Sequence, residues 1–227
     1  MRALALNRTF VRQLIWSHTK LTTTELVPEV SLRLITPECP LWKATPEQCP
    51  FNDPYWAFFW PGGQVLSRYI LDNPHLFYKK SVLDVGSGCG GSSLACKLAG
   101  ASYVVANDID QVAEVALEIN MEANSLHINT DISNRLSSHL KEPFDFVLLG
   151  DMFYDPEFTE TVIYWIQQQT NNSSVLIGDP GRHALLNHPI KTKLHQVAEY
   201  ALPKTCQLEN NGLSLGKVWL LDRINMT

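Results

Sequence analysis

The stretch SVLDVGSGCGG, residues 81–91, constrains the fold of this chain more than any other. An apolar run typical of a buried strand contains Asp84, and Gly86, Gly88 and Gly90-Gly91 then lead into a helical pattern. Glycines are needed where a backbone turns sharply and approaches a ligand closely. The stretch therefore predicts a strand, a ligand-binding loop and a helix, which together begin a parallel α/β sheet.

Strand and helix patterns alternate along the rest of the chain. Strands are expected at 81–85, 103–106, 127–130, 144–149 and 174–177, and helices at 64–71, 91–98, 111–123, 157–168 and 191–201. Two closing strands, 204–208 and 215–221, are separated by little chain and should form an antiparallel pair. The alternation predicts the α/β class, with a doubly wound, mostly parallel seven-stranded sheet and helices on both faces.

The N-terminal part of the chain has a different character. Residues 36–63 are rich in Trp and Cys and include six prolines, which leave no room for a long helix. We therefore expect an N-terminal extension with an aromatic, proline-rich segment over 1–63, and one domain over 64–227. Most of the aromatic series in 55–60 is expected to form a packed plug over the sheet.

Composition excludes several classes of protein. A net charge of −5 and a pI of about 5.8 argue against nucleic acid as the main partner. No apolar stretch is long enough to span a membrane, and a monomer is the default. The five scattered cysteines do not have the spacing of zinc ligands, and we expect them to be reduced thiols. The spacing of His183, His188 and His195 fits no common zinc signature either, so we expect no metal.

Residues 1–24 carry basic and hydroxyl side chains and no acid, since Glu25 is the first acidic residue. That composition resembles a mitochondrial targeting segment and predicts the mitochondrial matrix, with the cytoplasm as the alternative. The competing interpretation is a basic first helix that belongs to the fold, with an apolar stripe of Phe10, Leu14 and Ile15.

The glycine loop alone does not identify its ligand, because Gly86, Gly88 and Gly91 also match the dinucleotide pattern G-x-G-x-x-G. Asp84 favours a different ligand. A pyrophosphate at this helix N-terminus would face the like charge of the carboxylate. S-adenosylmethionine instead presents an ammonium and a sulfonium, which a carboxylate stabilises. The pattern D-x-G-x-G-x-G therefore predicts this methyl donor, with a dinucleotide or a purely structural turn as alternatives.

Two further acids follow neighbouring strands. Asp108 lies 20 residues after Gly88, where an acid typically binds ribose hydroxyls, whereas Asp110 could instead cap the next helix. Asp131 follows the third strand, where it could accept a hydrogen bond from the adenine amino group while Ile132 packs on the ring. The alternative interpretation of Asp131 is a loop acid without a ligand.

The octapeptide LLGDMFYD, residues 148–155, places Asp151 and Tyr154 at the exit of the fourth strand, beside the glycine loop. An amine acceptor that arrives as ammonium must lose a proton before it attacks a sulfonium methyl. A carboxylate and a phenol can bind that nitrogen, orient it and help the proton leave. We predict an acceptor site here; the alternative is a loop acid beside a half-buried aromatic.

These motifs resemble the seven-strand, Rossmann-like methyltransferases, and the D-x-x-Y form of residues 151–154 resembles their protein-lysine branch. With the flanking stretches, the resemblance narrows to the lysine methyltransferases of the electron transfer flavoprotein β subunit and runs from about residue 19 to about residue 219. The matching flanks include NDPYWAFFWPGGQVLSRYILDNP and VLIGDPGR, and the more distinctive segments are Trp60-Pro61-Gly62-Gly63 and Gly178-Asp179-Pro180-Gly181-Arg182.

The resemblance implies S-adenosylmethionine-dependent methylation of lysine side chains on that β subunit, in mitochondria, with another protein or a small molecule as the alternative acceptor. It implies an acceptor site around Asp151 and Tyr154, and Asp179 and Arg182 are weaker candidates for the substrate side, since Asp179-Pro180-Gly181 suits a simple turn. The donor contacts that it implies are Trp60, Asp84, Gly86, Gly88, Asp108 and Asp131.

Overall fold

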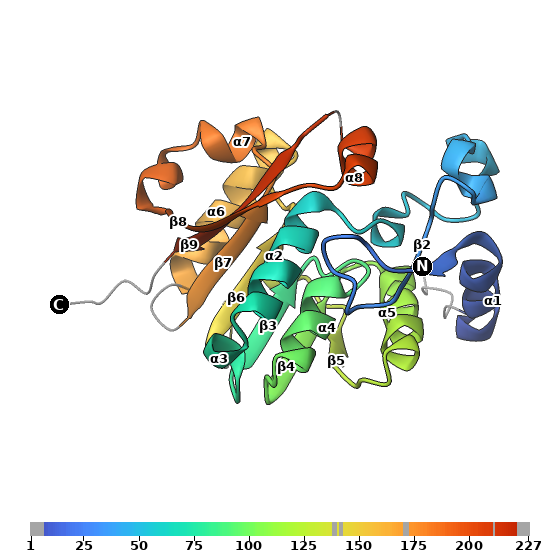
Figure 1. Ribbon diagram of the computed structural model, residues 1–227, viewed down its shortest axis with the longest axis horizontal. Helices are drawn as coiled ribbons and strands as arrows, with labels where there is room; N and C mark the ends of the chain where they lie inside the picture. The colour runs from blue at the N-terminus through green and yellow to red at the C-terminus, as the bar shows by residue number, and fades with distance from the viewer. Residues whose placement is uncertain (1–6, 138–139, 141–142, 170–172, 211, 222–227) are drawn as a thin grey trace.

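The computed structural model describes residues 7–137, 140, 143–169, 173–210 and 212–221 (Figure 1). A seven-stranded sheet has the order β5-β4-β3-β6-β7-β9-β8, and a two-stranded hairpin pairs β1 with β2. The strands are β1 Lys20–Thr22, β2 Leu32–Leu34, β3 Ser81–Val85, β4 Tyr103–Asn107, β5 Asn129–Asp131, β6 Phe146–Gly150, β7 Ser174–Asp179, β8 His195–Ala201 and β9 Leu215–Leu221. The α-helices are α1 Arg8–His18, α2 Pro61–Asp72, α3 Pro74–Phe77, α4 Gly91–Leu98, α5 Gln111–Ala123, α6 Pro156–Gln169, α7 His183–Leu186 and α8 Lys204–Glu209.

Strand directions confirm the predicted doubly wound, mostly parallel α/β sheet. Strands β5, β4, β3, β6 and β7 are parallel to their neighbours, whereas β9 runs antiparallel to both β7 and β8. Chain order reverses between β3 and β6, which lie side by side in the sheet. Open α/β sheets bind ligands outside the carboxyl ends of their strands at such a reversal, so the topology itself selects the site.

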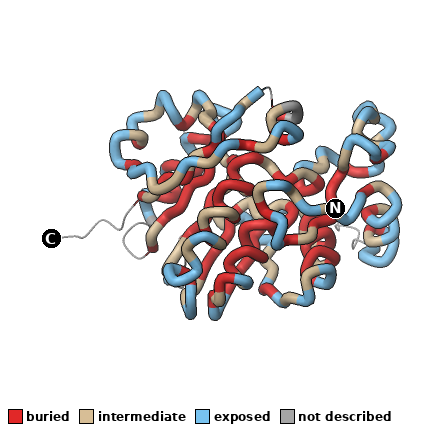
Figure 2. Tube along the Cα trace, in the orientation of Figure 1, coloured by how far each residue is buried: buried red, intermediate tan, exposed pale blue. Residues whose placement is uncertain are grey.

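Alternating side chains of the strands form the cores on the two faces of the sheet. On one face, Val82 and Leu148 pack with the apolar stripes of α2 and α4. On the other, Leu83 and Leu149 pack with Ile166 and the rest of the buried side of α6. Figure 2 shows this burial as a continuous buried band through the strands and the helices that flank them.

The C-terminal region corrects two of the sequence-based predictions. The expected helix 191–201 is wrong, because the chain forms a short 3-10 helix, η5 Pro189–Lys193, and then strand β8 His195–Ala201. The expected strand 204–208 is also wrong, because those residues lie in α8 Lys204–Glu209. Strand β8 is an edge strand with mostly exposed or half-buried side chains, so it lacks the hydrophobic signal of a buried strand. The predicted antiparallel pair exists, but β8 is the partner of β9.

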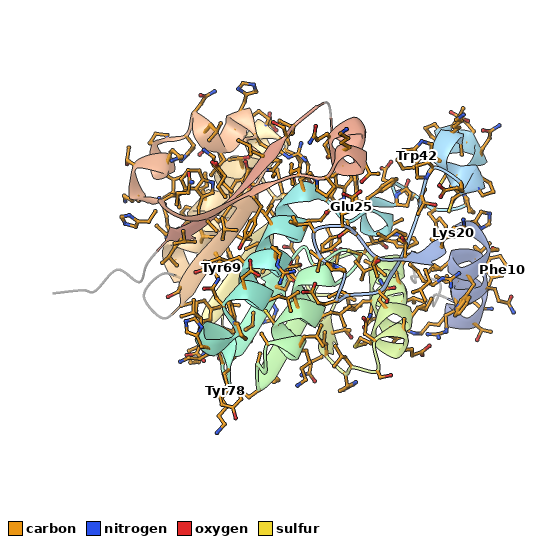
Figure 3. All side chains as sticks on the ribbon, in the orientation of Figure 1. Phe10, Lys20, Glu25, Trp42, Tyr69 and Tyr78 are labelled. Carbon is orange, nitrogen blue, oxygen red and sulfur yellow. The ribbon has the colours of Figure 1, made fainter. Side chains whose placement is uncertain are left out.

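The basic segment near the N-terminus forms helix α1, which packs against α5. Ile15 is fully buried and Val11 nearly so, whereas Phe10 is 55% exposed and lies on the outer side of the helix, contrary to the expected stripe (Figure 3). Arg8 pairs with Glu114 at 2.7 Å and with Glu118 at 2.6 Å, and the next turn of α1 repeats the contact through Arg12 and Glu122. Residues 8–18 are therefore an element of the fold, as the alternative interpretation held.

The aromatic, proline-rich segment packs largely as a plug. Its short 3-10 helices are η1 Pro40–Lys43, η2 Pro46–Gln48 and η3 Tyr55–Ala57, and a further one, η4 Arg135–Ser137, follows β5. Trp56 and Phe59 are buried, as expected, but Tyr55 is 65% exposed. None of the helices in the described ranges combines the length and the apolar character that a membrane crossing requires.

Candidate active site

The glycine loop after β3 adopts the sharp turn that its sequence predicts. Gly86, Gly88 and Gly90 all have positive φ, at +67°, +51° and +81°, which is the left-handed region that L side chains rarely adopt. A methyl group on Gly86 would lie 2.4 Å from the Met152 sulfur, so Met152 would have to move, and the positive φ would strain any other residue there. The loop that follows β3 therefore contacts the segment that follows β6.

Asp84 is a buried carboxylate in β3, two residues before the first glycine of this turn. It is 3% exposed, and its Oδ2 accepts a hydrogen bond of 2.7 Å from the Ser93 hydroxyl of α4. Burial raises the pKa of Asp84 to about 7. Among the described residues, no lysine or arginine forms a salt bridge with it. An anionic form here lacks a counter-charge, and the ammonium of a bound ligand would supply one.

Asp108 and Asp110 have different roles. Asp108 Oδ2 accepts a 3.0 Å hydrogen bond from the Gly88 N–H, and its Oδ1 accepts one of 3.0 Å from the Asp110 N–H. The Asp110 side chain instead caps α5, since it accepts a hydrogen bond of 2.8 Å from the Val112 N–H. The capping interpretation of Asp110 is therefore confirmed, and Asp108 remains the candidate ligand residue.

Asp108 and Asp131 line one small recess at the carboxyl ends of β4 and β5. Its other walls are Ser87, Ala106, Ala113, Glu114, Leu117 and Thr130. The two acids that the sequence assigned to ribose and adenine thus share a site with the glycine loop. A hydroxyl-rich and amine-bearing ligand such as adenosine matches this set of carboxylates and its apolar floor.

Asp131 is held in place by its neighbours. Its Oδ2 accepts a hydrogen bond from the Arg135 Nε, one of 2.9 Å from the Ser133 hydroxyl and one of 3.1 Å from the Asn107 amide. Partial burial acts to raise the pKa of Asp131, but the Arg135 and Ser133 hydrogen bonds outweigh it and keep the pKa below its ordinary value. Ile132 is 43% exposed, so it is free to pack against a ligand.

Asp151 is buried where β6, β7 and α2 meet. Its side chain is 5% exposed, its Oδ2 accepts a hydrogen bond from the Gly62 N–H, and its Oδ1 accepts two from Arg182, of 2.7 Å from Nε and 2.5 Å from Nη2. Burial raises the pKa of Asp151, and the Arg182 charge opposes that rise. The carboxylate is thus an anchored anion and not a freely rotating base.

Two glycines make the close approach of α2 possible. A methyl group on Gly62 would lie 2.2 Å from the Gly178 carbonyl oxygen and 2.5 Å from the Asp151 backbone nitrogen. The first turn of α2 therefore rests directly on the ends of β6 and β7. The Trp-Pro-Gly-Gly segment stands out in the sequence, but this contact was not predicted. The sequence feature that could have indicated this contact is the pair of glycines at the start of the helix. Glycine is less favourable than alanine in a helix, so its presence there suggests that two backbones come close.

Tyr154 lies at the surface of the same edge. Its side chain is 60% exposed, and its ring stacks on Phe158 with 5.5 Å between centroids. Desolvation raises the pKa of its phenol, and the nearby Tyr55, Asp155 and Asp108 add to the rise. The two candidate acceptor residues therefore divide into a buried anion, Asp151, and an exposed phenol, Tyr154.

Trp60 and Asp179 have contacts that bear on their predicted roles. The Trp60 indole nitrogen donates a 2.9 Å hydrogen bond to the Tyr55 carbonyl, and its ring lies 5.5 Å from that of Phe58, so contact with adenosine stays a prediction. Asp179 Oδ1 accepts hydrogen bonds from the backbone N–H groups of Gly181 and Arg182, at 2.7 and 2.8 Å. The expected turn is confirmed. No cluster of three or more metal-ligating side chains occurs within the described ranges.

Comparison with known proteins agrees with this geometry. Residues 56–185 match the family model described as Lysine methyltransferase. Two curated relatives are each named electron transfer flavoprotein beta subunit lysine methyltransferase. The Mus musculus protein is 45% identical, over 89% of this chain and 80% of that protein. The Homo sapiens protein is 42% identical, over 92% of this chain and 81% of that protein. A Caenorhabditis elegans homolog of the same enzyme is 41% identical over 90% of this chain and 93% of that protein.

Solved structures share the fold at low sequence identity. The ribosomal protein L11 methylase of Lactobacillus delbrueckii subsp. bulgaricus superimposes with a TM-score of 0.54 at 18% identity, covering 90% of this chain and 99% of that one. A putative methyltransferase complexed with SAH gives a TM-score of 0.58 at 13% identity, covering 89% of this chain and 55% of that one. The fold is that of the Rossmann-like methyltransferases, and, given the family match over the whole site, the chain belongs to the lysine methyltransferase family.

Proposed function

We propose that this chain transfers methyl groups from S-adenosylmethionine to lysine side chains of the electron transfer flavoprotein β subunit. One observation carries the substrate: the mouse, human and nematode relatives, at 41–45% identity over about nine tenths of this chain, are all named for that β subunit. The same similarity supports the function and the donor that the sequence motifs predict.

The donor side of the site suits S-adenosylmethionine. Asp84 offers a buried carboxylate to the α-ammonium, and Asp108 offers a carboxylate to the ribose hydroxyls beside the glycine loop. Asp131 and Ile132 are assigned to the adenine in this proposal, because Asp131 lines the same recess as Asp108 and the neighbouring Ile132 is 43% exposed. Bound S-adenosylmethionine supplies a methyl group on a sulfonium, which becomes a neutral thioether when the lysine nitrogen has taken the methyl.

The acceptor side must deliver a neutral amine. A lysine side chain has an ordinary pKa of about 10.4, so it arrives as an ammonium and must lose one proton before attack. Asp151 provides fixed negative charge near the arriving nitrogen, and the exposed Tyr154 phenol can orient it at the mouth of the site. The proton leaves to solvent, to which Tyr154 is open, so no covalent intermediate with the protein is required.

The test is methyl transfer itself. Purified protein is incubated with methyl-labelled S-adenosylmethionine, with and without recombinant electron transfer flavoprotein, and the label is located by peptide mass. We expect label on lysines of the β subunit, lost in Asp151→Ala although donor binding measured by calorimetry persists. Asp84→Lys is the matched donor-site variant and should lose donor binding. Label absent from the β subunit despite donor binding would redirect the search to another acceptor.

For location and assembly, we propose a mitochondrial matrix enzyme that acts as a monomer. Support for the compartment comes from the acid-free composition of residues 1–24, although residues 8–18 of that segment also pack into the fold as α1. Expression of the whole chain with a C-terminal tag, followed by fractionation of mitochondria, tests it; a cytosolic tag would favour the alternative. Light scattering that gives about 25.6 kDa, the mass of one chain, would support the monomer.

A further inference from the structure

The ion pair between Asp151 and Arg182 joins two segments that leave adjacent strands. Arg182 follows β7 and contacts Asp151 at the exit of β6 through both Nε and Nη2, which converge on one carboxylate oxygen, Oδ1. Side-chain exposure is 5% for Asp151 and 23% for Arg182. The carboxylate is thus buried behind a guanidinium that still reaches solvent.

The backbone around Arg182 fixes the direction of its guanidinium group. Asp179 Oδ1 accepts hydrogen bonds from the Gly181 and Arg182 N–H groups, and Gly181 has a φ of +102°, a conformation that favours glycine. The turn therefore sets the position of Arg182 before any substrate arrives. Asp179 is itself fully buried, and its Oδ2 has no hydrogen-bond partner among the residues that the structure describes.

The opposite side of Asp151 is fixed as well. Its Oδ2 accepts a hydrogen bond from the Gly62 N–H at the start of α2, and its own N–H donates to the Gly178 carbonyl at 3.0 Å. Oδ1 has no such backbone donor in the described contacts and relies on Arg182. Removing Arg182 would leave half of a buried carboxylate without its partner, which favours rotation or protonation of the group.

We propose that Arg182 is a positioning residue for methyl transfer, which acts by holding Asp151 ionised and in one orientation against the start of α2. This inference rests on the proposed function, because it assigns Asp151 to the acceptor side. It departs from the sequence-based view of Arg182 as a residue that lines the substrate. A lining residue would contribute its own contact to the substrate, whereas a positioning residue contributes nothing once Asp151 is gone.

A double-mutant cycle separates these two roles. Arg182→Gln, Asp151→Asn and the double variant are compared with the wild type, with the β subunit as acceptor. We expect Arg182→Gln to lower kcat at least about tenfold while KM and the donor Kd stay within about twofold. The double variant should then lie within about twofold of Asp151→Asn alone, since the two changes break one interaction. Arg182→Lys keeps the positive charge but offers one nitrogen in place of two, and it should retain an intermediate kcat.

Arg68→Gln is the matched control, because Arg68 also pairs with two carboxylates, Glu29 and Asp72, but on the outer part of α2. Its kcat should equal that of the wild type. A raised KM with unchanged kcat in Arg182→Gln, or losses that simply add in the double variant, would overturn the proposal in favour of direct substrate contact.

Urea unfolding of the wild type, Arg182→Gln, Asp151→Asn and the double variant, all without ligand, provides a readout that does not depend on activity. The two single changes should be non-additive in the free energy of unfolding, and additive values would contradict the proposed coupling whatever the acceptor. If the wild type places no label on the β subunit but the coupling is present, the proposed substrate fails and the link between Arg182 and Asp151 stands.

Discussion

Replacing Gly62 with alanine would place a methyl group inside the contact between α2 and the sheet. That methyl carbon would lie 2.2 Å from the Gly178 carbonyl oxygen and 2.5 Å from the Asp151 nitrogen, and both are backbone atoms that no side-chain rotation can move. The start of α2 must therefore lift away from β6 and β7. Lifting it also breaks the hydrogen bond from the Gly62 N–H to Asp151.

The cost can be worked out from these two effects. Overpacking a close contact costs about 1–3 kcal/mol, and the loss of a hydrogen bond to a charged group costs about 1.5–3 kcal/mol. Alanine regains about 0.5–1 kcal/mol over glycine in a helix. We therefore expect Gly62→Ala to lower the free energy of unfolding by about 2–5 kcal/mol, measured by urea denaturation followed by tryptophan fluorescence.

The adjacent glycine provides the control. A methyl group on Gly63 would meet the edge of the Phe59 ring at 3.2 Å and no backbone atom within the same range, so a small shift of the ring relieves it. Gly63→Ala should lie within about 1 kcal/mol of the wild type, because the helix gain offsets the tight contact. Equal losses in the two variants, or a loss under about 1 kcal/mol in Gly62→Ala, would refute the close-approach argument.

Four other substitutions test the site and the fold. Asp84 has a pKa of about 7 in the folded chain, against an ordinary value of 3.8. As pH rises, the unfolded chain therefore loses this proton before the folded chain does. The free energy of unfolding should then fall between about pH 4 and about pH 7. Asp84→Asn should remove that share of the pH dependence in ligand-free urea titrations, and an unchanged slope would argue against it. Asp108→Ala should weaken donor binding at least about tenfold by calorimetry, whereas Asp110→Ala should cost about 1 kcal/mol of stability as a lost cap and leave the donor Kd near wild type. Ile15→Ala should lower the free energy of unfolding by about 2–4 kcal/mol, and a neutral result would show that α1 does not stabilise the domain.

Much of the sheet could be predicted from the sequence because its buried strands carry their own signal. The strand before the glycine loop, 81–85, and the helix after it, 91–98, have the predicted bounds, since apolar runs and glycines mark both ends. The region 191–208 was mispredicted for the opposite reason. Strand β8 pairs on one side only, and its Gln, Ala and Glu residues have no strand preference, so pairing with β9 overrides local propensity.

The candidate site divides in the same way. Asp108 could be placed because its distance from Gly88 along the chain follows from one strand-helix-strand unit. The partners of Asp151 could not, because Gly62 and Arg182 lie 89 and 31 residues away in the sequence. Only the sheet order, which places β6 beside β7, brings these segments together. Local patterns therefore indicate which acids lie at the sheet edge but not which cation or helix start holds each one.

The conformation of Asp151 indicates why that edge is built as it is. Among the described residues, four that are not glycine have positive φ, and Asp53, Lys79 and Ser125 are exposed turn residues, whereas Asp151 is buried with a φ of +58°. Such a conformation costs about 1–3 kcal/mol, and a buried ion pair is often no more stabilising than apolar packing. Neither feature improves the core, and together they hold one carboxylate between the start of α2 and Arg182 at the carboxyl ends of β6 and β7. Local strain combined with a buried charge is typical of functional sites, which supports the role proposed for Asp151.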